Sequence, residues 1–308
     1  MSSFPSGQIN PESVPEIAPA LTYEQYEALA DMEVDADLHS KGRRVFSALM
    51  NARFGDMIID TSQGFKDHAY EIAKGGVVVA SVHRDELETL DLPCALEQVG
   101  IHHARPIGKS GIVEVSPFLG GRIIKNLVTS WGMVPVKRGA RDLIGLNRFQ
   151  EKALDPERDG GPQNLIIYDE KGRVRSNVET VRPGGSAAVL AAGEHDSLFA
   201  PVAMAGLSTE IDPDTKKKLR RDKRIWFNGG HLKRVYAFGD PFRLGVMPMV
   251  AEYKRGELSD AELDIFNEEK ERRNEIVHAA MQTALNRAYE IRGSSLEKEY
   301  RAYKRRSK

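Results

Sequence analysis

The chain has 308 residues, of which 41% are hydrophobic and 29% are charged, as in a soluble globular protein. Its 44 basic and 45 acidic residues give a formal net charge of −1, so the overall charge indicates no particular partner. Cys94 is the single cysteine, which excludes an intramolecular disulfide framework and any cysteine-rich zinc or iron–sulfur site.

Hydropathy and the start of the chain bear on its location. No stretch approaches the roughly 20 consecutive apolar residues that span a bilayer. The polar, proline-rich residues 1–20 lack the basic-then-apolar order of a secretory signal. We therefore expect a cytoplasmic protein, with peripheral attachment to the inner face of the membrane as an open alternative. We expect neither a metal nor a resident cofactor.

The first part of the chain predicts an arm followed by helices. Four prolines within residues 1–21 disfavour a helix there and indicate a flexible or surface-wrapping arm. Thr22 is followed three residues later by Gln25, which is the spacing of a capping box and predicts a helix start. A second helix is expected over about 38–54. Its apolar residues at helical spacing, expected to face the sheet, are Val45, Leu49 and Ala52.

A histidine directly follows the most apolar strand pattern of the chain. The β-branched run 77–82 comes after Gly75 and Gly76 and predicts a buried strand that delivers His83 to its end. Ligands of open α/β sheets bind at the carboxyl ends of the strands. A carboxylate that holds an imidazole in one tautomer makes it a general base, so we predict that His83 and Glu88 form a catalytic pair.

Two alternatives stay open at this stretch. Taken alone, a histidine at the end of a strand is more often a solvated or structurally satisfied residue than a catalytic base. Five positions also separate His83 from Glu88, so the pair forms only if the histidine precedes the first helical turn. Asp91 is a further acid within reach, or it caps a second short helix ahead of Pro93.

The rest of the chain predicts alternating strands and helices. Strands are expected over 101–105, 111–115, 134–139, 165–168, 199–205 and 235–238, with a turn over 106–109 and a charged loop over 169–176. Helices are expected over 118–131, 143–152, 187–192, 259–291 and 296–306. Contacts of the long C-terminal helix are expected from Leu263, Phe266, Ile276, Ala280, Leu285 and Tyr289. The alternation predicts an α/β fold with a mostly parallel, mixed central sheet flanked by helices.

These patterns divide the chain into four parts. We expect an N-terminal arm over 1–21, a helical segment that packs on the core over 22–74, an α/β core over 75–250 and a C-terminal helical extension over 251–308.

Three motifs follow one another in the core. His83 and Glu88 frame four residues, Gly132 and Arg138 frame five, and residues 168–176 form an aromatic, acidic and basic run that ends in Arg-Ser. In this order they resemble the signatures of the glycerolipid acyltransferase family. Its first signature is a histidine, four residues and an aspartate, so Glu88 is a departure. Its third signature, aromatic-Pro-Glu-Gly-Thr-Arg-Ser, is altered here by loss of the proline and two extra residues.

The resemblance implies acyl transfer from acyl-CoA or an acyl carrier protein to the hydroxyl of a glycerol phosphate or lysophospholipid, in phospholipid biosynthesis. It implies that His83 deprotonates this hydroxyl while Glu88 orients the ring. The implied substrate-binding residues are Lys109, Gly132, Arg138, Glu170, Gly172, Arg173 and Arg175. Among them, Arg138 and either Arg175 or Arg173 bind phosphate, and backbone N–H groups near Gly172 receive the oxyanion.

A basic segment of the chain indicates partners other than the substrates. The basic segment 216–224, followed by Trp226 and Phe227, is expected to contact an anionic membrane surface or an acidic carrier protein, unless it is a solvated loop. We expect no nucleic acid, because no zinc, helix-turn-helix or RNA-binding motif accompanies the charge.

Two other functions stay open. The departures at Glu88 and within 168–176 also fit a non-catalytic protein that binds a lipid or an acyl chain, and His83 also fits a hydrolase of acyl thioesters. We expect His195 to be exposed and Cys94 to serve helix packing. The other histidines without a recognisable catalytic pattern are His39, His68, His102, His103, His231 and His278.

Overall fold

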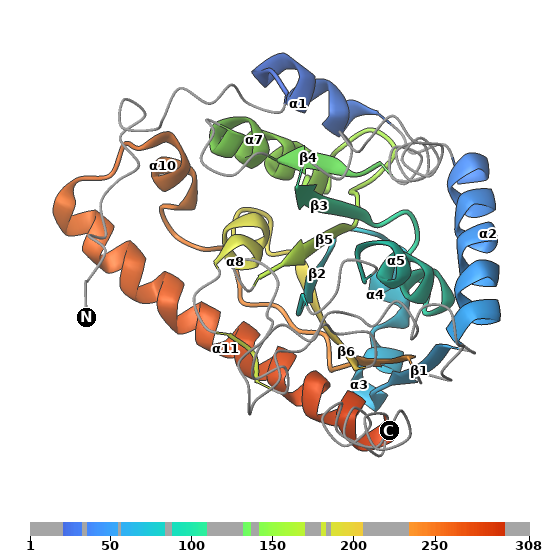
Figure 1. The fold of residues 1–308 in the computed structure, drawn as a ribbon. Coiled ribbons are helices and arrows are strands. Elements are labelled where there is room, and N and C mark those ends of the chain that lie inside the picture. Colours follow the sequence, from blue (N-terminus) through green and yellow to red (C-terminus); the bar gives the residue numbers. More distant parts are fainter. Residues whose placement is uncertain are drawn as a thin grey trace, which may run out of the picture.

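The computed structural model describes residues 21–32, 36–54, 57–83, 88–109, 132–136, 142–169, 180–182, 186–205 and 234–292. Its strands are β1 (Met57–Thr61), β2 (Val77–Ser81), β3 (Arg105–Lys109), β4 (Val134–Val136), β5 (Leu165–Tyr168), β6 (Leu198–Ala205) and β7 (Arg234–Phe238). They form one sheet in the order β1-β7-β6-β2-β5-β3-β4 (Figure 1). Every neighbouring pair is parallel except β6 and β7. The expected α/β fold with a mostly parallel, mixed sheet is therefore confirmed.

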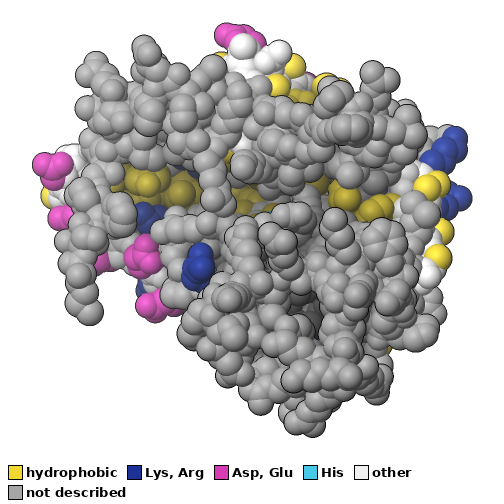
Figure 2. All heavy atoms as spheres, in the orientation of Figure 1, with side chains coloured by type: hydrophobic (Ala, Val, Ile, Leu, Met, Phe, Trp, Pro, Cys, Tyr) yellow, Lys and Arg dark blue, Asp and Glu magenta, His cyan; other side chains and the backbone are white. Residues whose placement is uncertain are grey.

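Helices cover both faces of this sheet (Figure 1). They are α1 (Tyr23–Asp31), α2 (Ala36–Phe54), α3 (Gln63–Asp67), α4 (Ala69–Ala73), α5 (Glu88–Gln98), α7 (Asp142–Leu154), α8 (Ala187–Ala192), α10 (Val250–Arg255) and α11 (Asp260–Arg292). Figure 2 shows a band of hydrophobic side chains across one face of the molecule. None of the described helices is both long and apolar enough to cross a membrane.

Strand β2 separates two hydrophobic clusters. Val77 and Val79 pack with residues of α3, α4 and α5, whereas Val78 and Ala80 pack with residues of α1, α7, α8 and α11. All four side chains are fully buried, because successive residues of a strand point to opposite faces and both faces are covered. The sequence of β2 is apolar without interruption because this strand lies in the centre of the sheet, between β5 and β6.

A glycine turn sets where β2 begins. Gly75 has φ = +84°, and a Cβ on this residue would lie 2.4 Å from the carbonyl oxygen of Pro162. Only glycine fits both the left-handed backbone and the close approach. The amide side chain of Asn164 continues the connection by accepting a hydrogen bond from the backbone N–H of Val77 at 3.0 Å.

Helix α1 starts as the sequence predicts. The backbone N–H of Thr22 donates to Gln25 Oε1 at 2.8 Å, and the backbone N–H of Gln25 donates to Thr22 Oγ1 at 3.3 Å, which is a complete capping box. The hydroxyl of buried Tyr26 then donates to the carbonyl of Pro135 at 2.7 Å. Helix α1 is thereby fastened to β4 at the edge of the sheet.

Several expectations for the first part of the chain are corrected. The segment 22–74, expected to be helical, also contributes β1, which pairs with β7 at the sheet edge. Helix α2 packs on α5 through Arg43, which donates to the carbonyl of Pro93 at 3.1 Å. Val45 and Ala52, expected to face the sheet, are exposed, because the contact with α5 uses another side of the helix.

The predicted turn over 106–109 is a strand instead. Strand β3 lies between β5 and β4, with Pro106 opposite Ile166 and Gly108 opposite Pro135. Proline and glycine favour a turn locally, but pairing on both sides overrides this preference. The expected strand over 101–105 is correspondingly a turn that ends at β3.

Helix α11 extends along β6 and β7 (Figure 1). Leu263, Phe266 and Leu285 are buried as predicted. Ile276 is 39% exposed, and Val277 is fully buried in its place, so the inward face was predicted one position too early there. The arm 1–20, the strand 111–115, the helices 118–131 and 296–306 and the loop residues 170–176 lie outside the described residues.

Candidate active site

His83 lies at the carboxyl end of β2, two residues beyond Ser81. Strands β2 and β5 stay paired up to this edge, since Ser81 is opposite Tyr168 and the N–H of Asp169 donates to the carbonyl of Ser81 at 3.3 Å. Because β2 and β5 are parallel, their carboxyl ends meet here, and this is the edge at which α/β proteins bind ligands.

The structure brings His83 and Glu88 together. Nδ1 of His83 lies 3.5 Å from Oε2 of Glu88, and the side chains are 20% and 0% exposed. Glu88 is the first residue of α5, where a carboxylate is favoured by the unpaired N–H groups of the first turn. The histidine precedes this turn, which is the arrangement that a spacing of five residues requires. The ring is thus held against a buried carboxylate and keeps some contact with solvent.

A tyrosine packs on the imidazole of His83. The ring of Tyr168, the last residue of β5, packs on the ring of His83 with centroids 4.6 Å apart and planes tilted by 39°. Burial raises the pKa of Tyr168 well above its usual range, and the nearby Glu88 adds to the rise. The phenol therefore stays protonated. Tyr168 belongs to the third of the predicted motifs, but its contact with His83 was not predicted, because this contact depends on the register of β2 and β5.

A buried ion pair lies one helical turn beyond Glu88. Asp91 accepts from Arg234 Nη1 at 2.5 Å and from the hydroxyl of Tyr236 at 3.2 Å. Arg234 also donates to Asn51 Oδ1 of α2 at 2.5 Å. Burial raises the pKa of Asp91 and Glu88 raises it further, while Arg234 and Tyr236 oppose the rise. Asp91 thus lies within α5 and binds two residues of β7. The alternative that it caps a second short helix is wrong, because α5 continues through Asp91.

A second histidine–carboxylate pair lies at the same sheet edge. Nε2 of His278, on α11, is 3.1 Å from Oδ2 of Asp169, and the side chains are 13% and 0% exposed. Oδ1 of Asp169 accepts the backbone N–H of Ala188 in the first turn of α8. Asp169 follows Tyr168 directly, so it ties α8 and α11 to the end of β5. His278 falls in no catalytic pattern of the sequence, because it lies 109 positions from Asp169.

Two other predictions concern single residues. His195, expected to be exposed, is half-buried, and its Nε2 lies 2.9 Å from the backbone carbonyl of Glu151, because the turn after α8 folds back on α7. Cys94 is buried within α5 as predicted. Burial raises the pKa of its thiol to about 12.

The remaining predicted substrate-binding residues are only partly described. Gly132 has φ = +66°, and its carbonyl accepts from Arg105 Nε at 2.9 Å. Lys109 is the last residue of β3, but its side chain lies outside the described part. Five further predicted residues and the basic segment lie wholly outside the described part: Arg138, Glu170, Gly172, Arg173, Arg175 and 216–224.

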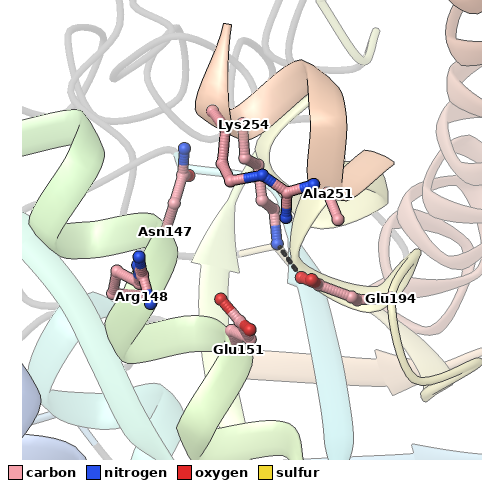
Figure 3. Close-up of a pocket in the computed structure, with 7 residues that line it drawn as sticks. Asn147, Arg148, Glu151, Glu194, Ala251 and Lys254 are labelled. Atoms are coloured by element: carbon pink, nitrogen blue, oxygen red, sulfur yellow. Dashed lines mark hydrogen bonds and ion pairs between the residues drawn. The ribbon is translucent and has the colours of Figure 1, made fainter. Parts of the chain in front are cut away.

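Two cavities lie among the described residues away from His83. One, of about 260 Å³, is lined by α7, α10 and the turn that holds Glu194 (Figure 3). Lys254 Nζ pairs there with Glu194 Oε2 at 2.6 Å. The other, of about 330 Å³, lies at the amino ends of β2, β3 and β5, beside His102 and His103. Nowhere in the described ranges do three or more His, Cys, Asp or Glu side chains form a group that could hold a metal ion.

No protein-family model matches the chain, and a search of curated proteins finds no similar protein. The fold and the geometry define an α/β protein with a histidine–glutamate pair at the carboxyl edge of its sheet. Such a pair can remove a proton from an alcohol or a water molecule that reaches the other ring nitrogen, Nε2.

Proposed function

We propose that this protein is an acyltransferase that moves a fatty acyl group from acyl-CoA or an acyl carrier protein to the hydroxyl of a glycerol phosphate or lysophospholipid. The observation that carries the proposal is the 3.5 Å approach of His83 Nδ1 to the buried carboxylate of Glu88 at the carboxyl end of β2. The order of the three motifs in the sequence supports the choice of substrates.

The reaction starts with the imidazole as a base. In this proposal Glu88 accepts a hydrogen bond from the Nδ1–H of His83, which holds the ring in the tautomer that has its lone pair on Nε2. Nε2 takes the proton of the acceptor hydroxyl as its oxygen attacks the thioester carbonyl. The tetrahedral intermediate collapses, the C–S bond breaks, and the imidazolium returns its proton to the departing thiolate. No acyl-enzyme is formed, and no metal takes part.

Cationic side chains bind the phosphate of the acceptor in this proposal. Arg138, together with Arg175 or Arg173, binds the phosphate, since a guanidinium matches two phosphate oxygens at once. Lys109, Gly132, Glu170 and Gly172 complete the substrate site. The basic segment 216–224 contacts an anionic membrane surface, which places the protein peripherally on the cytoplasmic face.

Two other functions remain as alternatives. A non-catalytic protein that binds lipid or acyl chains is favoured by the replacement of the family's aspartate with Glu88. A thioesterase would use water in place of the acceptor hydroxyl. Product analysis separates these functions, because a thioesterase releases free fatty acid whether or not an acceptor is present, and a binding protein forms no product.

The test is an acceptor screen with labelled acyl-CoA and acyl carrier protein donors, read by mass spectrometry. His83→Ala and Glu88→Gln are expected to lower the turnover by about 100-fold or more, the usual contribution of a general base. The matched control is His102→Ala, since this ring is exposed at the opposite sheet edge and pairs with Glu97. Unchanged transfer by His83→Ala would refute the assignment of the base.

A second variant tests the rival histidine. His278 has a carboxylate partner at the same edge, so His278→Gln examines whether this pair carries the reaction instead. We expect His278→Gln to retain transfer. A loss of transfer in His278→Gln together with full activity in His83→Ala would move the base to α11.

A further inference from the structure

A basic cavity lies at the edge of the sheet opposite to the end of β2 that carries His83. The cavity has a volume of about 330 Å³ and is formed at the amino ends of β2, β3 and β5. Lys74, His103 and Arg158 line it, and none of the described residues in its wall is acidic. A concave surface with cations on its wall concentrates anions from the solvent.

Arg158 is fixed in this wall by neutral groups. Its guanidinium donates to the backbone carbonyls of Ala30 at 2.9 Å, Gly161 at 2.9 Å and Asp31 at 3.4 Å. Each terminal nitrogen of a guanidinium carries a pair of N–H groups, and each uses one of them here, so the second N–H on either nitrogen remains for a ligand. Within the described part of the chain no carboxylate pairs with Arg158, so its charge is not neutralised.

A second guanidinium adds to this positive charge. Arg105 is 2% exposed and donates to the carbonyls of Gly132 and Leu29 and to Oε1 of Gln163, which lines the cavity. Burial lowers the pKa of Arg105 to about 10, and the charge of Arg158 contributes to the fall. The two guanidinium groups therefore act on each other, and all the partners named for them are neutral.

The acids next to the cavity already bind other cations. Glu97 binds Arg43 and accepts the backbone N–H of His103 at 3.0 Å. Glu71 pairs with Arg243 at 2.9 Å. Neither acid belongs to the lining of the cavity. The positive charge of the wall is thus available to a ligand.

Two glycines leave space beside these cations. Gly100 and Gly161 line the cavity with φ = +87° and +81°, and a Cβ on either residue would meet no atom within 4 Å. Glycine takes this left-handed backbone without strain. A ligand can therefore approach the backbone closely at these two points.

We propose that this cavity binds a small, soluble molecule with a phosphate group, and that Arg158 and Lys74 are its cationic contacts. The two remaining N–H groups of Arg158 can meet two oxygens of one phosphate, and Lys74 supplies a second charge for this dianion. Sites for small molecules have volumes of about 300–1,000 Å³, so the cavity has room for an organic part as well. The site lies away from His83, and its existence does not rest on the proposed acyl transfer.

The test follows the ring signals of His103 by NMR of the full-length protein with ¹⁵N-labelled histidine. These signals are assigned by their loss in His103→Gln. The probe is inorganic phosphate, added at constant pH and at an ionic strength held constant with sodium chloride. We expect the His103 signals to shift and to saturate with phosphate, and acetate at the same ionic strength to bind roughly 10-fold more weakly or less.

Two variants locate the binding. Arg158→Met and Lys74→Met are each expected to weaken phosphate binding roughly 10-fold or more, the usual loss for a hydrogen bond between charged groups. Lys74 Nζ lies 4.3 Å from the ring centroid of Tyr70 on the neighbouring α4, so its removal separates no distant elements. If Arg158→Met releases α1 or does not fold, Lys74→Met therefore decides alone.

The matched control is Lys66→Met, the same change at an exposed lysine of α3 that does not line the cavity. It is expected to leave the phosphate affinity unchanged, because salt screens distant surface charges. The inference is overturned if phosphate gives no saturable shift, if acetate binds as tightly, or if Lys66→Met weakens binding as much as Lys74→Met. Acyl transfer is measured separately, so its absence would refute the proposed function and leave the phosphate result unaffected.

Discussion

The phenol ring of Tyr168 lies against the imidazole of His83, with ring centroids 4.6 Å apart. The contact joins the ends of two neighbouring parallel strands, β5 and β2, whose last residues, Tyr168 and Ser81, are in register. A flat aromatic surface on one side of the imidazole and the carboxylate of Glu88 at Nδ1 restrict the ring in two directions. The orientation of the predicted base thus depends on the register of the sheet as much as on the His83–Glu88 spacing.

Substitutions of Tyr168 test this support. Tyr168→Phe keeps the ring and is expected to change the free energy of unfolding by no more than about 1 kcal/mol, because it removes one hydroxyl. Tyr168→Ala removes the ring and is expected to cost about 3 kcal/mol. Urea unfolding measures both values. Equal stabilities of the two variants would show that the ring contributes nothing to the packing at this edge.

Substitution of Gly145 in α7 by alanine is predicted to destabilise the protein. A Cβ on Gly145 would lie 2.4 Å from Cδ2 of Tyr26, so the ring and α1 with it must shift. Gly→Ala usually stabilises a helix interior by about 1 kcal/mol, but here we expect a loss of about 1–3 kcal/mol from overpacking. Urea unfolding and faster hydrogen exchange in α1 measure the effect.

The control for this substitution is Arg148→Ala, an exposed position on the same helix. Its effect on stability is expected to stay within about 0.5 kcal/mol. A stabilising Gly145→Ala substitution would contradict the close approach of Tyr26.

Glu269 of α11 predicts a dependence of stability on pH. Arg272 and Arg273 donate hydrogen bonds to its carboxylate and lower its pKa from about 4.5 to about 2. A carboxylate with a lowered folded-state pKa stabilises the fold above about pH 4.5, and this contribution is lost as the pH falls toward about 2. Glu269→Gln should therefore cost about 0.5–1 kcal/mol near neutral pH, a value limited by partial exposure.

The difference between wild type and Glu269→Gln should shrink as the pH is lowered through this window in urea unfolding. Glu268→Gln, an identical chemical change at the exposed neighbouring residue, is the control and should show no such trend. A penalty for Glu269→Gln that is constant with pH would rule out the ionised carboxylate as its cause.

Cys94 is predicted to be unreactive in the folded protein. The thiol is 4% exposed, and its pKa of about 12 leaves almost no thiolate near neutral pH. A thiol reagent should label it slowly in buffer and completely in urea. Ala52→Cys, at an exposed position of α2, provides a thiol that reacts at once under the same conditions. Rapid labelling of Cys94 itself in buffer would mean that α5 opens readily.

Much of the fold follows from local patterns in the sequence. The β-branched run before His83 predicts β2, the Thr22–Gln25 spacing predicts the start of α1, and the small residues 187–192 predict α8 with its observed bounds. These patterns are local because capping and side-chain periodicity involve residues a few positions apart. The proximity of His83 and Glu88 was predictable for the same reason.

Other features were decided only by the tertiary structure. Strand β3 forms from a Pro-Ile-Gly stretch that favours a turn, because β5 and β4 pair with it on either side. The partners of Asp91 and Asp169 are more than 100 positions away in the chain, at Arg234 and His278. Neither pairing leaves a local pattern. The sequence alone thus determined many of the elements and the candidate base, whereas long-range packing decided which residues pair with the buried carboxylates of Asp91 and Asp169.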